Sequence, residues 1–392
     1  MDEGAGGSWD LRLLMATRVL RAFGFGFAAV LLGIHLERRG LSPLLIGIVL
    51  TVGLLAAALT SLAAAGLSGR LGRRRTLALT GVLMMLSGVL LVVAAQPWQL
   101  ILAGATGMLG AASSDVGPFL AIEQAALTES VSASGRNRAF ARYSLLGGFA
   151  TMAGGLAAAL GDQLGTTFFF GLYAALGLLT ALLPLLVSPA VERDRRGPTF
   201  AAWRPLMKLN AVLALDSFAG AFMAVTLVSY WLHVRFGADS SVLGPLFGAL
   251  ALLQSLSYEV AGRLADRIGL INTMVFTHAP AQLLVFAVPF APSLGWAIAL
   301  LLGIGCLSEM DVPARQAYLA SIVRPAEREG AIALVGATRT FSQVLAPTVA
   351  GAAIQVAAYG VPFFATATLK LVFLGVLYAG WRGRPAEHEV AR

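Results

Sequence analysis

Ionisable side chains inside long apolar stretches are the residues of this sequence whose types best suit chemistry. A charged group costs at least a few kcal/mol at the centre of a bilayer, so these side chains should face a polar cavity or one another. A carboxylate there can take up and release a proton, because removal from water favours its neutral form. An arginine can hold an anionic group or exchange carboxylate partners. The candidate cavity residues are Arg18, Arg21, Asp115, Asp216, Glu309, Asp311, Arg315 and Arg339.

The apolar stretches that carry these residues predict an all-α membrane protein. The chain has 392 residues, of which 58% are hydrophobic and 12% charged, whereas soluble domains carry roughly 25% charged residues. Apolar runs of about 20 residues recur, which is the length of a helix that crosses a bilayer. We predict twelve spans, at residues 11–35, 44–67, 76–95, 98–128, 139–161, 165–188, 206–234, 243–264, 271–290, 294–323, 330–357 and 361–381.

Arginines gather in the loops on one side of these spans. Loops around residues 70–75, 136–138, 193–204, 263–267, 324–328 and 382–384 are basic, whereas the opposite side carries little beyond Arg38, Arg39 and Arg235. The positive-inside rule then places both termini in the cytoplasm. It also explains the net charge of +8 without a nucleic-acid partner. The N-terminal segment has no features of a removed signal peptide, so we expect a multi-pass protein of a bacterial inner membrane.

The two halves of the chain repeat each other. The polar break at residues 189–205 separates a first bundle, residues 1–188, from a second, residues 206–392. The loop Gly-Leu-Ser-Gly-Arg-Leu-Gly-Arg-Arg-Arg at 66–75 corresponds to Gly-Arg-Leu-Ala-Asp-Arg-Ile-Gly at 262–269. Asp115-Val-Gly-Pro118 likewise corresponds to Asp311-Val-Pro313. Several matches in the same order indicate duplication, and two parallel repeats are an architecture of transporters.

These motifs make the chain resemble the major facilitator superfamily over essentially its whole length. The resemblance implies two pseudo-symmetric six-helix bundles, alternating access, and a cavity lined by spans 1, 4, 7 and 10. Gly69 stands where the family usually has aspartate, and residues 101–112 lack the charge expected of the antiporter arginine. By resemblance, the gating loops contain Gly66, Arg70, Gly72, Arg73, Arg74, Gly262, Asp266, Arg267 and Gly269.

Helical spacing places most of the candidate cavity residues in one belt near the bilayer midplane. At 1.5 Å per residue they lie roughly 10–20 Å from the cytoplasmic helix ends. Asp311 and Arg315 share a helix face, so they bind solute or simply neutralise each other. Pro118 and Pro313 should break spans 4 and 10 just after the matched aspartates, and such broken helices mark transport sites.

Other ionisable residues have structural interpretations. Glu123 and Arg142, both nearer the cytoplasmic end, should form an ion pair that is either structural or functional. His278 lies inside a span, but no two histidines cluster, so we expect no metal site and no cofactor. Tyr143 could line the cavity, although core packing is the better interpretation.

The combined pattern predicts a secondary active transporter. It would move a small polar or charged organic solute by alternating access, as a monomer, with protons as coupling ions and export as the preferred direction. A lipid or amphiphile flippase and a facilitative uniporter remain alternatives, as does a non-transporting receptor. The sequence carries no metalloprotease, hydrolase-elbow or P-loop motif, so we expect no enzyme. The residues do not identify the solute.

Overall fold

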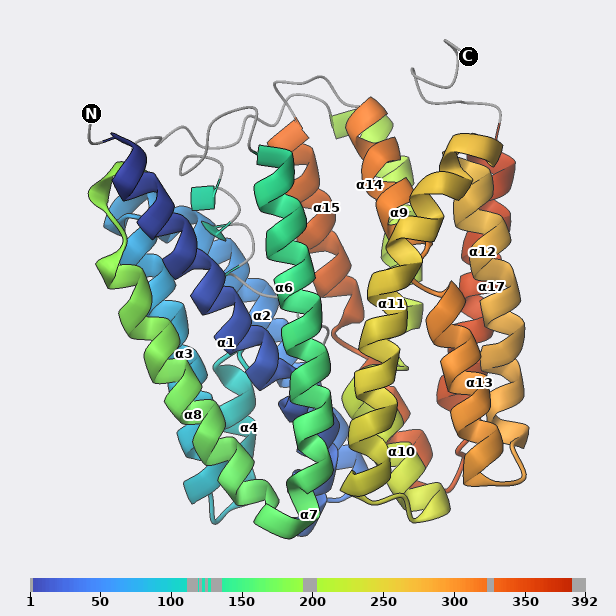
Figure 1. Cartoon of the computed structure of the whole chain (residues 1–392). Helices are drawn as coiled ribbons and strands as arrows, with labels where there is room; N and C mark the ends of the chain where they lie inside the picture. The colour runs from blue at the N-terminus through green and yellow to red at the C-terminus, as the bar shows by residue number, and fades with distance from the viewer. Residues whose placement is uncertain are drawn as a thin grey trace.

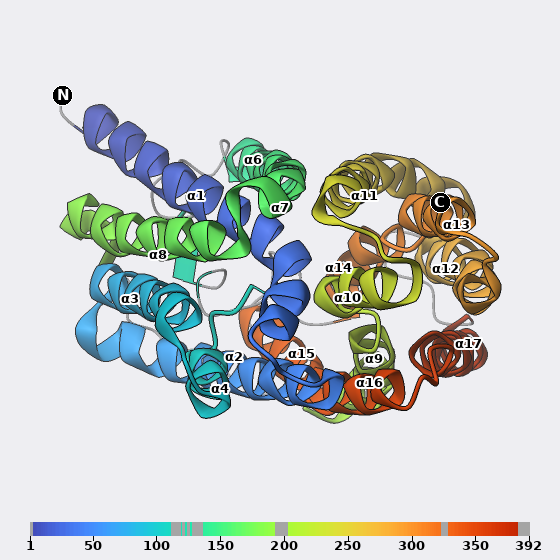
Figure 2. The ribbon, with the colours of Figure 1, turned by 90° about the horizontal axis from the view of Figure 1, so that it is seen from below.

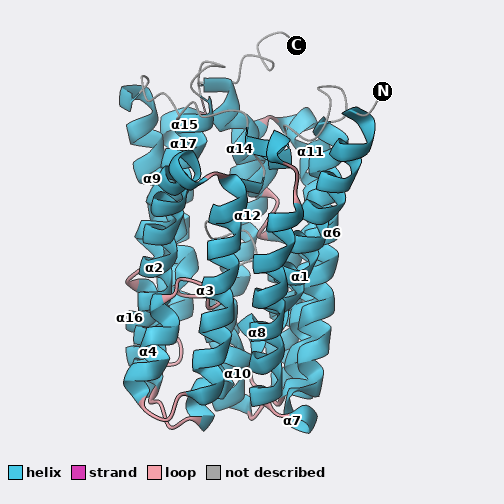
Figure 3. Ribbon diagram, turned by 90° about the vertical axis from the view of Figure 1, so that its left-hand side faces the viewer, coloured by secondary structure: helices cyan, strands magenta, loops and turns pink. Residues whose placement is uncertain are grey.

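The predicted all-helical fold is confirmed by the computed structural model. The structure describes residues 3–110, 119, 122–123, 126–127, 136–192, 203–322 and 328–382. Within these residues there are helices and short connections and no strand, as Figure 3 shows. Nine helical segments of the described chain are long and apolar enough to cross a membrane. The helices run side by side along the long dimension of the molecule (Figure 1).

The helices of the first half match the predicted spans closely, except for the fourth. The predicted span 98–128 is described only in part: a short helix ends at Ala105, and Gly107 and Gly110 then take φ values of 73° and 67°. That left-handed backbone favours glycine and stops the helix. The helices are α1 (Glu3–Arg38), α2 (Pro43–Leu71), α3 (Arg73–Val93), α4 (Pro97–Ala105), α6 (Arg136–Ala157), α7 (Gly161–Leu164) and α8 (Thr166–Leu182).

Three predicted spans of the second half each consist of two helices. Short breaks at residues 222–224, 308–310 and 344–345 divide the spans predicted at 206–234, 294–323 and 330–357. The divided pairs are α9 (Trp203–Ala221) with α10 (Val225–Phe236), α13 (Leu294–Leu307) with α14 (Asp311–Ile322), and α15 (Arg328–Gln343) with α16 (Ala346–Gln355). The continuous helices are α11 (Ser240–Ile268), α12 (Leu270–Ala287) and α17 (Val361–Trp381).

The two predicted gating loops have the same backbone. Gly72 joins α2 to α3 with φ 86° and ψ 157°, and Gly269 joins α11 to α12 with φ 87° and ψ 161°. This region of φ and ψ is essentially restricted to glycine. The same interval of sequence separates Gly40 from Gly237, which also have positive φ. Glycines with positive φ thus recur at corresponding positions of the two halves, as the predicted repeat requires.

The two halves pack tightly at the end opposite the start of α1. Figure 2 views this end, with α1–α8 gathered on one side, α9–α14 and α17 on the other, and α15 and α16 beside α2 at the boundary. Gly47 of α2 lies against the backbone of α16, so that a Cβ atom there would overlap the Pro347 carbonyl. Gly244 of α11 makes an equivalent approach to Ala159. Across the same boundary the Thr226 hydroxyl donates to the Ala29 carbonyl at 2.8 Å. Glycines therefore permit close backbone contact between the halves.

Candidate functional site

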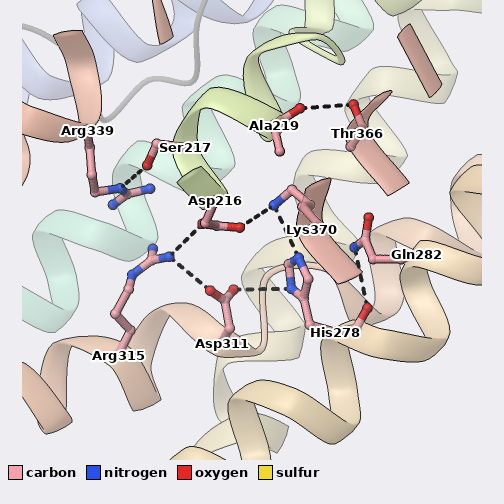
Figure 4. Close-up of polar contacts among 10 residues, drawn as sticks. All are labelled: Asp216, Ser217, Ala219, His278, Gln282, Asp311, Arg315, Arg339, Thr366 and Lys370. Carbon is pink, nitrogen blue, oxygen red and sulfur yellow. Dashed lines mark hydrogen bonds and ion pairs between the residues drawn. The ribbon is translucent and has the colours of Figure 1, made fainter. Parts of the chain in front are cut away.

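Five ionisable side chains of the second half form a closed ring of polar contacts (Figure 4). Asp216 of α9 accepts from Lys370 Nζ at 2.8 Å and contacts Arg315 Nη1 at 3.4 Å. Arg315 also donates to Asp311 Oδ2 at 2.9 Å, both on α14. His278 of α12 lies between Asp311, at 3.7 Å, and Lys370 Nζ, at 3.2 Å. The ring thus joins α9, α12, α14 and α17.

The local fold of α14 explains how two ring members come from one short helix. Asp311 is the first residue of α14, directly after the break that ends α13, and Arg315 follows one turn later on the same face. Pro313 was predicted to break the helix after Asp311, and this position is wrong: the break precedes Asp311. Pro313 sits instead in the first turn, where a missing N–H interrupts no helical hydrogen bond.

The ring balances its own charge when His278 is neutral, because two carboxylates face one ammonium and one guanidinium. The ammonium of Lys370 can only donate, so Nε2 of His278 accepts and Nδ1 carries the hydrogen. Nδ1 lies 3.7 Å from Asp311, which is beyond hydrogen-bond distance, so it has no hydrogen-bond partner in the described part of the chain. Asp216, Asp311 and Arg315 are each at most 5% exposed. A proton added here would therefore leave a buried charge uncompensated.

Arg339 of α15 lies beside the ring without joining it. Its Nε donates to the hydroxyl of Ser217, the neighbour of Asp216, at 2.9 Å. One residue earlier, Thr338 accepts from the amide of Asn210 at 2.9 Å. These two bonds fix the polar face of α15 against α9, and they place a guanidinium next to the ring (Figure 4).

The first half holds a second buried cluster, centred on Glu123. Arg21 of α1 donates to both oxygens of Glu123, at 2.6 and 2.7 Å, in the two-pronged geometry that suits a guanidinium. The Tyr143 hydroxyl also donates to Glu123, and Thr17 donates at 3.3 Å. The predicted pair of Glu123 with Arg142 is therefore wrong. Arg142 is exposed on α6, one residue from Tyr143, and so its side chain points to another face.

Aromatic rings complete this cluster. The Arg21 guanidinium lies 4.2 Å from the ring centroid of Phe119, and Arg18 lies 4.9 Å from that of Tyr143. Such cation–π contacts suit buried arginines. Arg18 is 3% exposed and presses on Gly147 of α6, where a Cβ atom would overlap its guanidinium. The sequence-based preference for core packing at Tyr143 missed its hydrogen bond to a carboxylate.

The remaining predicted residues are not brought into either cluster. Asp115 and Pro118 lie outside the described residues. Glu309 lies in the break between α13 and α14 and makes no ion pair within the described ranges. In the gating loops, Arg70 and Arg267 are exposed at the ends of α2 and α11. Gly262 and Asp266 are helical residues of α11, and their side chains are outside the description.

The loop around Gly72 has one well-defined contact that the sequence did not indicate. The carboxylate of Glu192 lies against Gly72, where a Cβ atom would come within 2.6 Å of Oε1. This places a negative charge at the start of α3, next to Arg73 and at the favourable end of the helix dipole. Arg74 donates to the carbonyl of Leu185. The latch function of Gly66, Arg70 and their neighbours stays a prediction.

Lys370 is the ring member that sequence reasoning missed. It lies in the middle of the predicted span 361–381, in the run Ala-Thr-Leu-Lys-Leu-Val. A single lysine at that depth is itself a signal that a buried partner exists. His278 was noted in its span but was not grouped with the carboxylates, because its partners come from other helices.

The fold, with nine described segments long and apolar enough to cross a membrane, is that of a multi-pass membrane protein. The model of the Major Facilitator Superfamily matches residues 14–310 and 211–392. The chain therefore belongs to the Major Facilitator Superfamily. Membership of this family indicates a transporter rather than an enzyme.

Similar structures and one curated relative extend over most of the chain. A mutant of the nucleoside transporter NupG superposes with a TM-score of 0.77 at 14% identity, covering 95% of this chain and all 100% of that one. A bacterial homologue of the human lysosomal transporter Spinster gives 0.74 at 16% identity, covering 96% and 97%. The Saccharomyces cerevisiae (strain ATCC 204508 / S288c) membrane protein YJR124C is 24% identical over 394 residues, 88% of each chain. At such low identities the similar structures show the fold alone.

Proposed function

We propose that this protein is a proton-coupled secondary transporter of a small polar or charged organic solute. The observation that carries the proposal is the closed ring of Asp216, Lys370, His278, Asp311 and Arg315. A facilitative uniporter needs no titratable group in its core. A ring of buried, mutually neutralised charges gives a proton a place where its arrival changes helix packing.

The coupling step follows from the charge balance of the ring. A proton bound by either carboxylate or by His278 leaves one cation without a counter-charge in a poorly solvated place. The contacts of Lys370 with Asp216, or of Arg315 with Asp311, then weaken. Because these contacts join four helices, their loss lets α9, α14 and α17 shift relative to one another. Release of the proton on the other side of the membrane restores the ring and the original packing of these helices.

The direction of access is assigned from the arginine-rich loops. The close contacts between the halves lie at the end opposite these loops, around Gly47 and Gly244. If the basic loops are cytoplasmic, the described packing is closed towards the outside. Cytoplasmic termini, a bacterial inner membrane, a monomer and export are parts of this proposal. Export rests on analogy with exporter-like loop motifs.

The proposal is tested with purified protein in proteoliposomes. A solute is first selected from a compound panel as the one that most raises the thermal midpoint of unfolding. Its labelled form is then followed with and without an imposed pH gradient. We expect the gradient to drive accumulation in the wild type, and Asp216→Asn and Asp311→Asn to abolish that response. Transport that ignores the gradient and survives both substitutions would rule out proton coupling.

A further inference from the structure

Helix α15 is too polar to face lipid along its second half. Residues 337–343 read Ala-Thr-Arg-Thr-Phe-Ser-Gln, and α15, with 16 residues, is not among the shorter apolar helices of the described chain. Polar and charged groups at membrane depth turn towards protein or a water-filled cavity. Figure 2 shows α15 between the two groups of helices, with α2 on one side and α9 on the other. Helix α15 therefore lies at the boundary between the halves, with Thr338 and Arg339 hydrogen-bonded to α9.

Arg339 is the charged residue of this polar segment. It is partly exposed, and its one hydrogen bond, from Nε to the Ser217 hydroxyl, involves an uncharged partner. Its two terminal amino groups have no protein partner in the described part of the chain. The two ring carboxylates nearby are already bound by Lys370 and Arg315. Arg339 thus brings a positive charge that the described contacts do not neutralise.

An uncompensated guanidinium at this depth is costly and needs a counter-charge. The Nε bond orients the plane of the guanidinium and leaves the terminal amino groups free to donate together. That geometry matches two oxygens of a carboxylate or phosphate. We propose that Arg339 binds an anionic carboxylate or phosphate group of the transported solute. The inference rests on the proposed transport function and names its substrate class: organic anions.

Glu309 is the alternative counter-charge for Arg339. It lies in the break before Asp311 and makes no ion pair among the described residues, Arg339 included. If Glu309 neutralises Arg339 in solution, removing the charge of Glu309 would either strengthen anion binding at Arg339 or destabilise the protein by leaving Arg339 uncompensated. The variant Glu309→Gln therefore separates an internal ion pair from a site open to solute.

Inorganic phosphate is a suitable probe, because it carries the oxygens of the proposed group and needs no knowledge of the solute. Thermal unfolding of the full-length protein in detergent is followed during titration with phosphate against chloride of equal ionic strength. A ligand that binds only the folded state raises the midpoint saturably. We expect a rise of about 2 °C in the wild type and in Glu309→Gln.

Two substitutions of Arg339 and one control complete the test. Arg339→Gln should abolish the saturable rise, and Arg339→Lys, which keeps the charge but not the two-pronged geometry, should retain a smaller one. Arg235→Gln is the matched control, because Arg235 is exposed and lies 5.7 Å from the Tyr359 ring centroid at the other end of the molecule. It should respond as the wild type does.

An equal phosphate response in the wild type and in both Arg339 variants would overturn the anion site, as would the absence of a saturable response in the wild type. A response confined to Glu309→Gln would assign Arg339 to an internal ion pair instead. The result is independent of proton coupling, which the pH gradient in proteoliposomes tests. If transport proves independent of the pH gradient while the phosphate response still depends on Arg339, the proposed coupling is excluded and the anion site is retained.

Discussion

Lys370 Nζ lies 2.8 Å from Oδ1 of Asp216, and this contact joins α17 to α9, the last and first described helices of the second half. The two residues are 154 positions apart in the sequence. Both are largely buried, so each charge depends on the other for compensation. The pair is therefore the part of the ring most directly tied to the packing of α9 against α17.

Removing one partner of this pair should cost more than removing both. Lys370→Met leaves Asp216 with only the longer contact to Arg315, and we expect a loss of roughly 3 kcal/mol in unfolding free energy. The double variant Asp216→Asn/Lys370→Met should recover part of that loss. Thermal unfolding in detergent measures both.

Lys208→Met is the matched control for that cycle. Lys208 is the other lysine of the chain and is exposed on α9. Its replacement should change stability by about 0.5 kcal/mol or less. If Lys370→Met proves as mild as Lys208→Met, the pair contributes little to the fold.

Glu123 should matter far more than Arg142. Glu123→Gln removes the carboxylate that holds Arg21 and Tyr143, and leaves the buried Arg21 guanidinium without a counter-charge among the described residues. We expect a destabilisation of about 3–5 kcal/mol. Arg142→Gln changes an exposed side chain and should stay within about 0.5 kcal/mol of the wild type. Equal losses for the two variants would favour the Glu123–Arg142 pair that the sequence suggested.

The sequence was sufficient for the fold because hydropathy and arginine placement act over whole spans. The glycines of the loops at Gly72 and Gly269 could be matched in advance, since their backbone conformation excludes other residues. The divisions within predicted spans 7 and 11 could not be predicted from the sequence. Gly220 precedes the break at residues 222–224 and Pro347 follows the break at 344–345, but such residues also lie inside continuous helices, as Pro245 does in α11.

Contact between α2 and α16 should depend on the absence of a side chain at Gly47. In Gly47→Ala the new methyl group would overlap the Pro347 carbonyl, which is backbone and cannot rotate away. We expect a loss of about 1–3 kcal/mol in thermal unfolding. Gly171→Ala is the control, because nothing lies within 4 Å of that position on α8. A neutral Gly47→Ala would mean that the halves are further apart than the structure has them.

The candidate site was only partly predictable. Asp311 and Arg315 share one helix, and their spacing alone indicates the contact. Asp216 could be placed at a similar depth. Its partner Lys370 comes from a helix that the resemblance did not assign to the cavity, and spacing within one helix says nothing about contacts between helices. The contact of Glu123 with Arg21 was missed for the same reason. The sequence favoured Arg142, which is nearer to Glu123 in the chain, over a residue of a distant helix.

Proton movement driven by solute tests the central claim most directly. Vesicles containing the protein and an internal pH indicator receive a gradient of the selected solute, without any imposed pH gradient. The account predicts a change of internal pH with wild type and none with Asp311→Asn or Asp216→Asn, while the Lys208→Met protein behaves as the wild type. Solute movement without any change of internal pH in the wild type would contradict it.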